Sequence, residues 1–203
     1  MAIVPPIKSF RPITEISRMP LPIAHACIGA SVATAAARCL SAKNATRLQI
    51  AGAVLAIVPD FDFFFVWVLG MAGWHRAFAH SLAFSVAVAA VVSLAFGTDW
   101  RRALPVLSAA MASHGLLDYL TSRLAPGPAL LWPFSSRRYG AGLIDYLDFS
   151  IRVRNPFEFL VLIVEVSMVE ALVFIPAFLA MRLVVNKLGS AKGREVAINQ
   201  ETV

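Results

Sequence analysis

Seven side chains able to bind a metal or move a proton lie within or beside long apolar runs of the sequence. They include all four histidines of the chain. Ionisable groups are costly inside a membrane segment, so they usually face the interior of a helix bundle and mark a functional site. The pattern therefore favours one shared polar site over the alternative that the seven residues are unrelated members of the core. The members are His25, Asp60, Asp62, His75, His80, His114 and Asp118.

Imidazoles and carboxylates without thiolates suit zinc, with manganese or iron as alternatives. Seven ligands exceed the four of one structural zinc site, so they could hold one ion with supporting groups, or two ions. A catalytic metal lowers the pKa of bound water to about 7 and so supplies hydroxide for hydrolysis. One aspartate outside the immediate ligands would act as general base. The expected catalytic residues are Asp60, Asp62, His80, His114 and Asp118.

Two spacings bear on this site. His114 and Asp118 are one helical turn apart and share a face, so they could bind a metal jointly, or the carboxylate could orient the imidazole. A buried His–Asp hydrogen bond accounts for that pair equally well. His75 and His80 are five residues apart and do not share a face of a straight helix. A change from loop to helix at Arg76 would let them converge.

Other polar residues are candidates for supporting roles. Glu165 has an expected depth in its helix similar to that of His114, which makes it a further candidate ligand, with a structural role as the alternative. Arg137 and Arg138 are candidates for binding an anionic substrate group, although a basic loop facing lipid phosphates explains them too. A Ser81–His80 nucleophile is disfavoured because adjacent residues on a helix do not face each other.

The elements that must position these residues are membrane helices. The chain has 203 residues, of which 59% are apolar and 15% charged, whereas soluble domains have about 45–50% and about 25%. About 20 helical residues span a bilayer core, and helices satisfy their own backbone hydrogen bonds. We therefore expect an all-α, polytopic transmembrane bundle of about five spanning helices. The five runs are residues 19–37, 48–74, 77–98, 103–122 and 159–181.

Further features subdivide the chain. We expect residues 1–18 to form a basic tail with no cleavable signal peptide, residues 19–185 to form the transmembrane domain, and residues 186–203 to form a polar tail. Within the domain, 123–156 is the long loop, punctuated by proline and glycine. Pro59 should break the second run, since proline removes a helical hydrogen bond. Cys27 and Cys39 lie about 18 Å apart along one expected helix, too far to form a disulfide.

The net charge of +6 comes from basic residues that lie mostly between the apolar runs. Such residues orient helices and contact anionic headgroups, so we expect no nucleic-acid partner. The expected partner is a membrane lipid or a lipid-linked small-molecule substrate. Membrane orientation and oligomeric state stay open.

Alternating helix directions can bring all seven residues into the half of the membrane nearer the N-terminus. An ion or proton transporter, or a membrane sensor, is the alternative to a hydrolase, because proton relays use the same groups. A transporter needs polar stations in both halves, and Glu170 is the one candidate near the midplane. The clustering at one side therefore favours a hydrolase.

The combined motifs resemble the YdjM-like family of bacterial membrane-bound, metal-dependent hydrolases over about residues 20–140. The resemblance implies a metal-dependent hydrolase of the bacterial inner membrane. The His-x3-Asp pair is also similar to that of zinc-dependent phospholipase C, but a second such pair is missing, so the three-metal set of those enzymes is not implied. The motifs are His25, Pro59-Asp60-Phe61-Asp62, His75-Arg76-x3-His80-Ser81, His114-x2-Leu117-Asp118 and Pro133-Phe134-Ser135.

Overall fold

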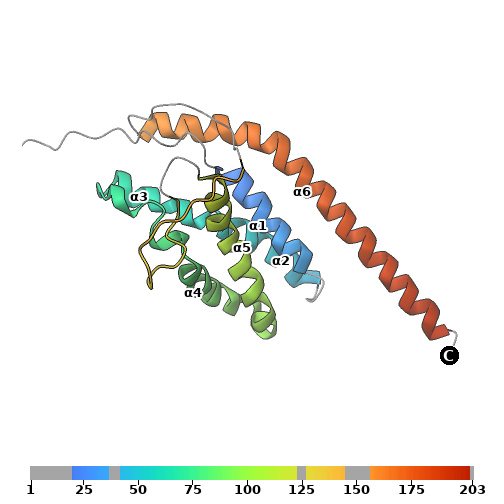
Figure 1. Cartoon of the computed structure of the whole chain (residues 1–203). Helices are drawn as coiled ribbons and strands as arrows, with labels where there is room; N and C mark the ends of the chain where they lie inside the picture. Colours follow the sequence, from blue (N-terminus) through green and yellow to red (C-terminus); the bar gives the residue numbers. More distant parts are fainter. Residues whose placement is uncertain (1–19, 37–41, 123–126, 145–155, 202–203) are drawn as a thin grey trace, which may run out of the picture.

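A computed structural model describes residues 20–36, 42–122, 127–144 and 156–201, and every regular element in these ranges is helical (Figure 1). The expected all-helical bundle is therefore confirmed. Residues 1–18, Cys39, and parts of the expected long loop (123–126 and 145–155) lie outside the described residues. The long helices of the described part are α1 (Pro22–Ala36), α2 (Ala42–Leu55), α4 (Leu82–Ser93), α5 (Trp100–Thr121) and α6 (Pro156–Glu201).

Three helical stretches are long and apolar enough to cross a membrane: Asn44–Val66, Leu82–Thr121 and Leu160–Lys187, with α1 as a shorter apolar helix. The second stretch comprises α4 and α5, which pack against each other. Between them lies Gly97 with φ of 59°, in the left-handed region that glycine adopts at little cost. If α4 and α5 are counted as two spans joined by this turn, the described helices agree roughly with the five expected spans.

Helix α1 lies at the centre of the packing, in contact with α2, α5 and α6. It approaches α2 closely at Gly29 and Gly52, where a Cβ on either glycine would overlap the backbone carbonyl of the other. Small residues at such crossings allow membrane helices to approach each other. Leu107 and Met111 of α5, both fully buried, fill the adjoining core.

The expected break at Pro59 is confirmed. Helix α2 ends at Leu55, and the chain continues through the 3₁₀ turn η2 (Val58–Asp62) into the short helix α3 (Phe63–Trp67). In an α-helix the Asp60 N–H would donate to the Ala56 carbonyl, but here it donates to the Ile57 carbonyl at 3.1 Å. The carbonyl of Ala56 is thereby left available to another donor.

The third expected helix begins later than its apolar run suggests. Residues 77–81 lie in and around the 3₁₀ turn η4 (Phe78–His80), which follows η3 (Ala72–Trp74), and α4 begins only at Leu82. The hydroxyl of Ser81 accepts a hydrogen bond from the Phe84 N–H at 3.1 Å, which caps the helix there. His80 therefore lies just outside α4.

Helix α6 is longer than the expected fifth span. It contains Pro176 and continues through the polar C-terminal segment as far as Glu201. Figure 1 shows its first part lying across one end of the bundle and its last part extending beyond the other helices. The expected polar tail is thus helical in its described part.

Candidate metal centre

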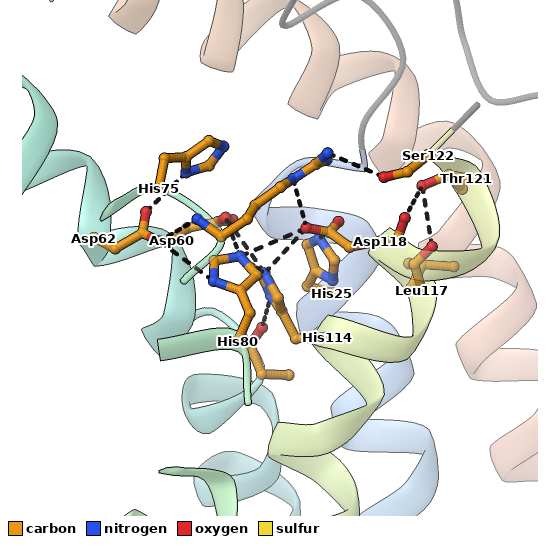
Figure 2. Close-up of polar contacts among 12 residues, drawn as sticks. His25, Asp60, Asp62, His75, His80, His114, Leu117, Asp118, Thr121 and Ser122 are labelled. Atoms are coloured by element: carbon orange, nitrogen blue, oxygen red, sulfur yellow. Dashed lines mark hydrogen bonds and ion pairs between the residues drawn. The ribbon is translucent and has the colours of Figure 1, made fainter. Parts of the chain in front are cut away.

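Histidines and aspartates from four elements converge at one end of the bundle (Figure 2). Two groups could each hold a metal ion, and they share His114. We call the five residues of these groups the His–Asp cluster. Its members come from α1, η2, η4 and α5, as the alternating helix directions led us to expect. They are His25, Asp60, His80, His114 and Asp118.

The orientation of His114 follows from the break in the second apolar run. Its Nδ1 lies 2.7 Å from the carbonyl oxygen of Ala56. Because a carbonyl only accepts, Nδ1 must carry the proton, which leaves the Nε2 lone pair facing the cluster. This Nε2 lies 3.0 Å from His80 Nε2 and 3.4 Å from Asp60 Oδ1.

His80 presents its Nε2 in the same way. Its Nδ1 lies 3.3 Å from Asp62 Oδ2, and its Nε2 lies 3.5 Å from Asp118 Oδ2 and 4.0 Å from Asp60 Oδ1. Burial lowers the pKa of the His80 imidazole, which favours its neutral, metal-binding form. Two ligands about 2.0–2.1 Å from a tetrahedral ion lie roughly 3.3 Å apart, so these separations suit a single ion.

Asp118 is fully buried beside Arg76, a buried cation that the sequence does not predict to be part of the site. Oδ2 of Asp118 lies 3.1 Å from Arg76 Nε, and Arg76 Nη1 donates to Ser122 Oγ at 3.0 Å. Arg76 has φ of 56°, a conformation uncommon outside glycine. Its N–H donates to Asp62 Oδ2 at 2.8 Å, which helps to hold that conformation. In the sequence, the one indication that Arg76 belongs to the site is its position next to His75.

Asp62 and His75 were expected to be ligands, but they lie outside both groups. Oδ1 of Asp62 lies 2.9 Å from His75 Nδ1, while its Oδ2 faces Arg76 and His80. The ring of His75 stacks on Phe63 at 4.2 Å between centroids. The geometry thus assigns Asp62 to positioning His80 and Arg76, with His75 at the edge of the cluster.

A cation fits the centre of this arrangement on two grounds. Several buried atoms have no hydrogen-bond partner within the described ranges, which costs roughly 1–3 kcal/mol for each group. In addition, three aspartates and the Arg76 guanidinium leave two negative charges when the imidazoles are neutral. One divalent ion would balance them and use the free lone pairs. The acceptor atoms without a hydrogen-bond partner are His25 Nε2, Asp60 Oδ1 and Asp118 Oδ1. Asp118 Oδ2 forms an ion pair with Arg76 Nε at 3.1 Å, and His80 Nδ1 lies 3.3 Å from Asp62 Oδ2.

His25 lies against this centre from α1. Its ring stacks on His114 at 3.7 Å between centroids, and its Nε2 lies 3.7 Å from Asp118 Oδ1. The sequence left open whether His25 was a ligand, and the geometry places it in reach of Asp118.

Two glutamates of α6, Glu165 and Glu170, differ from expectation. Glu165 is exposed, while Leu162 and Val166 on the same helix are buried, so the structure does not bring this predicted ligand to the cluster. Glu170 is fully buried and accepts hydrogen bonds from the N–H groups of Leu21 at 2.6 Å and Ala24 at 3.0 Å. It therefore caps the start of α1, beside the cluster end.

The two arginines predicted to bind substrate also differ from each other. Arg138 donates from Nη1 to the His75 carbonyl at 2.8 Å and from Nη2 to the Gly73 carbonyl at 2.7 Å. Burial lowers the pKa of its guanidinium. Arg137 is exposed, and its backbone N–H donates to Ser135 Oγ at 3.2 Å. Arg138 thus holds the loop that carries His75, and substrate binding by either arginine stays a prediction.

Fold and site together define a helical membrane protein with buried histidine and aspartate groups that could hold a metal ion. The YdjM inner membrane protein family matches residues 19–188, and the chain belongs to this family. The resemblance noted from the motifs is therefore confirmed. No curated protein and no solved structure matches the chain.

Proposed function

We propose that the chain is a metal-dependent hydrolase, a multi-pass protein of the bacterial cytoplasmic membrane that acts on a phosphoester or a lipid-linked ester. One observation carries the proposal: the His–Asp cluster gathers buried imidazole and carboxylate acceptors without a hydrogen-bond partner, His25 Nε2, Asp60 Oδ1 and Asp118 Oδ1, at a place where carboxylates outnumber the Arg76 guanidinium. A purely structural His–Asp pair needs neither feature, because its hydrogen bonds would satisfy both partners.

Four side chains are the proposed ligands of one divalent ion, and the charge balance with Arg76 favours one ion over two. Zinc suits the nitrogen and oxygen donors, with manganese or iron as alternatives. A bound ion would act as a Lewis acid and activate water for hydrolysis. The four ligands combine one group, Asp60, His80 and His114, with Asp118 of the other, and the proposed ligand atoms are His80 Nε2, His114 Nε2 and a carboxylate oxygen of each aspartate.

The remaining groups have proposed roles in positioning and proton transfer. Both oxygens of Asp62 already face His75, Arg76 and His80, so this residue holds the loop in place. His25 Nε2 has no hydrogen-bond partner and lies 3.7 Å from Asp118 Oδ1. It is the proposed acceptor of the proton that water gives up.

The distribution of buried polar groups favours a hydrolase over a transporter. Thr34 and Ser93 are buried away from the cluster, and each hydroxyl donates to a carbonyl of its own helix. Glu170, the expected midplane station, binds the start of α1. The described residues thus give no chain of titratable groups from one end of the bundle to the other.

Metal content and ester hydrolysis test the proposal directly. Protein purified in detergent without chelator should carry about one transition-metal ion per chain, measured by mass spectrometry. It should hydrolyse members of a panel of phosphoesters and carboxylic esters, and chelator should abolish that activity. His114→Ala should lose both metal and activity, while Ser113→Ala on the same helix should keep both. Protein that lacks metal and takes up neither zinc nor manganese would contradict the proposal.

A further inference from the structure

An apolar groove leads from the surface of the bundle to the His–Asp cluster. It has a volume of about 170 Å³ and lies between the start of α1, the η2–α3 segment and α6. Apart from one carboxylate, the side chains that line it are hydrocarbon. The residues that matter here are Leu21, Ile57, Asp60, Phe61, Phe63 and Ile163.

Asp60 is the one member of the His–Asp cluster in the lining of this groove, and its Oδ1 faces inward, 3.4 Å from His114 Nε2. The side chain of Asp60 is 12% exposed, whereas those of His80, His114 and Asp118 are 0% exposed. His25 is also buried, at 1%. Asp60 is therefore the cluster member that a molecule lying in the groove would meet.

A larger cavity of about 380 Å³ lies nearby but offers no such route. Its lining includes the aromatic residues Trp74, Phe78 and Trp132, and it contains no member of the His–Asp cluster. Its size suits a whole small ligand, but it ends on apolar side chains. Of these two cavities of the described residues, the smaller groove is the one that a cluster carboxylate lines.

We propose that the Asp60 groove binds a single hydrocarbon chain of an amphiphilic phosphoester or carboxylic ester, with the ester group next to Asp60. The proposal rests on the proposed hydrolase function and names its substrate class. The groove is smaller than the roughly 300–1,000 Å³ of pockets that enclose a whole ligand, which suits one narrow chain. Phe61, 71% exposed at its edge, would extend the apolar contact toward surrounding lipid, so a chain could enter without crossing water.

Photolabelling tests occupancy of the groove without requiring turnover. The probe is a long-chain alkyl phosphate with a diazirine on its chain, applied to detergent-solubilised full-length protein, with the labelled residues located by mass spectrometry. Label should concentrate on Ile57, Phe63 and Ile163. Ile163→Trp should reduce this labelling about tenfold by filling the groove. Val164→Trp, at a neighbouring position that is 53% exposed, should leave it unchanged. Label spread over the apolar surface and insensitive to Ile163→Trp would overturn the proposal.

A second pair of variants tests the groove independently, in case Ile163→Trp does not fold. Phe61→Ala removes an exposed edge of the groove, and Phe64→Ala removes a ring that is 56% exposed and lies outside it. Only Phe61→Ala should reduce labelling, with metal content unchanged in both. Equal labelling of the two variants would also overturn the proposal.

Measuring turnover of two esters distinguishes the proposed role of the groove from the proposed hydrolase function. With a long-chain ester, Ile163→Trp should lower kcat/KM about tenfold, while a short, water-soluble ester with the same reactive group should be cleaved as by the unmodified protein. Equal losses on both esters would overturn the groove. Absence of hydrolysis with every ester would contradict the proposed function alone, since the photolabelling result decides the groove.

Discussion

At the scale of single residues, His114 links the backbone to the cluster. The Ala56 carbonyl fixes its protonated Nδ1, which leaves Nε2 as the nitrogen able to bind a metal, and both candidate ligand groups include His114. Asp62 acts one step further out, because its oxygens hold His75, the Arg76 N–H and His80. Ligands and the residues that orient them should therefore respond differently to substitution.

Replacement of single aspartates by asparagine should reveal that difference. Asp62→Asn keeps an acceptor for the Arg76 N–H and should weaken zinc affinity about 10–100-fold, as is usual for groups that orient a ligand. Asp60→Asn removes a proposed ligand and a balancing charge, so its loss should be larger. Competition with a chromogenic chelator measures both affinities. Asp99→Asn, which changes an aspartate paired with Asn44 far from the cluster, is the control. Equal affinity in Asp60→Asn and the control would remove Asp60 from the site.

Arg76 gives a test of charge balance. Arg76→Met leaves Asp118 buried without its cation, which should lower the free energy of unfolding of metal-free protein by about 3 kcal/mol or more. Arg102→Met is the matched control, because Arg102 is 67% exposed and pairs with Asp99 at 3.8 Å. That pair should contribute at most about 1 kcal/mol. Denaturant unfolding in detergent, with chelator present, compares the two variants. Similar losses in both would show that Arg76 does not neutralise the cluster.

At the scale of elements, the site depends on two irregular segments and one straight helix. The break at Pro59 turns Asp60 toward the cluster, and the late start of α4 leaves His80 in a turn. That turn passes close to α5 at Gly115, where an added Cβ would lie 2.6 Å from the His80 carbonyl oxygen. Glycine next to His114 thus allows the two histidines to meet.

A methyl group at Gly115 should therefore separate His80 from His114. Gly115→Ala should reduce bound metal strongly and destabilise the fold by about 1–3 kcal/mol, as overpacking does. Gly73→Ala is the control, because a Cβ there would meet no atom within 4 Å. Metal content and thermal unfolding of the two purified variants provide the comparison. Full metal occupancy in Gly115→Ala would mean that the His80 turn can move without loss of the site.

Sequence spacing could predict those parts of the site that lie within one element. The shared face of His114 and Asp118 and the break at Pro59 follow from helix geometry and from the missing proline N–H. The start of α4 could not be read from hydropathy, because Ala77, Phe78 and Ala79 already belong to the apolar run and the Ser81 cap decides where the helix begins. Neither could the roles of Arg76 and Glu170, whose partners lie 42 and about 150 residues away in the chain: Asp118 for the one, and Leu21 and Ala24 for the other.

At the scale of the whole molecule, the bundle has two chemically different ends. The His–Asp cluster, the Arg138 contacts and the start of α1 lie at one end. At the other end of α2, Asn44 Nδ2 donates to Asp99 Oδ2 at 2.6 Å, which ties the start of α2 to the turn between α4 and α5. This pairing agrees with the alternating helix directions expected from the sequence. Together they predict that the two ends face opposite sides of the membrane.

Cysteine labelling in intact cells tests this topology, in a background with Cys27 and Cys39 replaced by serine. A cysteine at Gly73, or at the 92% exposed Phe134, should react with an impermeant maleimide from one side of the membrane. A cysteine at Gly97 or Arg101, near the Asn44–Asp99 contact, should react from the opposite side, because α5 separates the two regions by 22 residues, about 33 Å. That distance is close to the roughly 30 Å hydrocarbon core. Permeabilised cells, in which all four positions should react, control for exposure. Reaction of both pairs from the same side would mean that α4 and α5 re-enter the membrane without crossing it. Both ends of the bundle would then face one side of the membrane, and the prediction that α4 and α5 each cross it would be wrong.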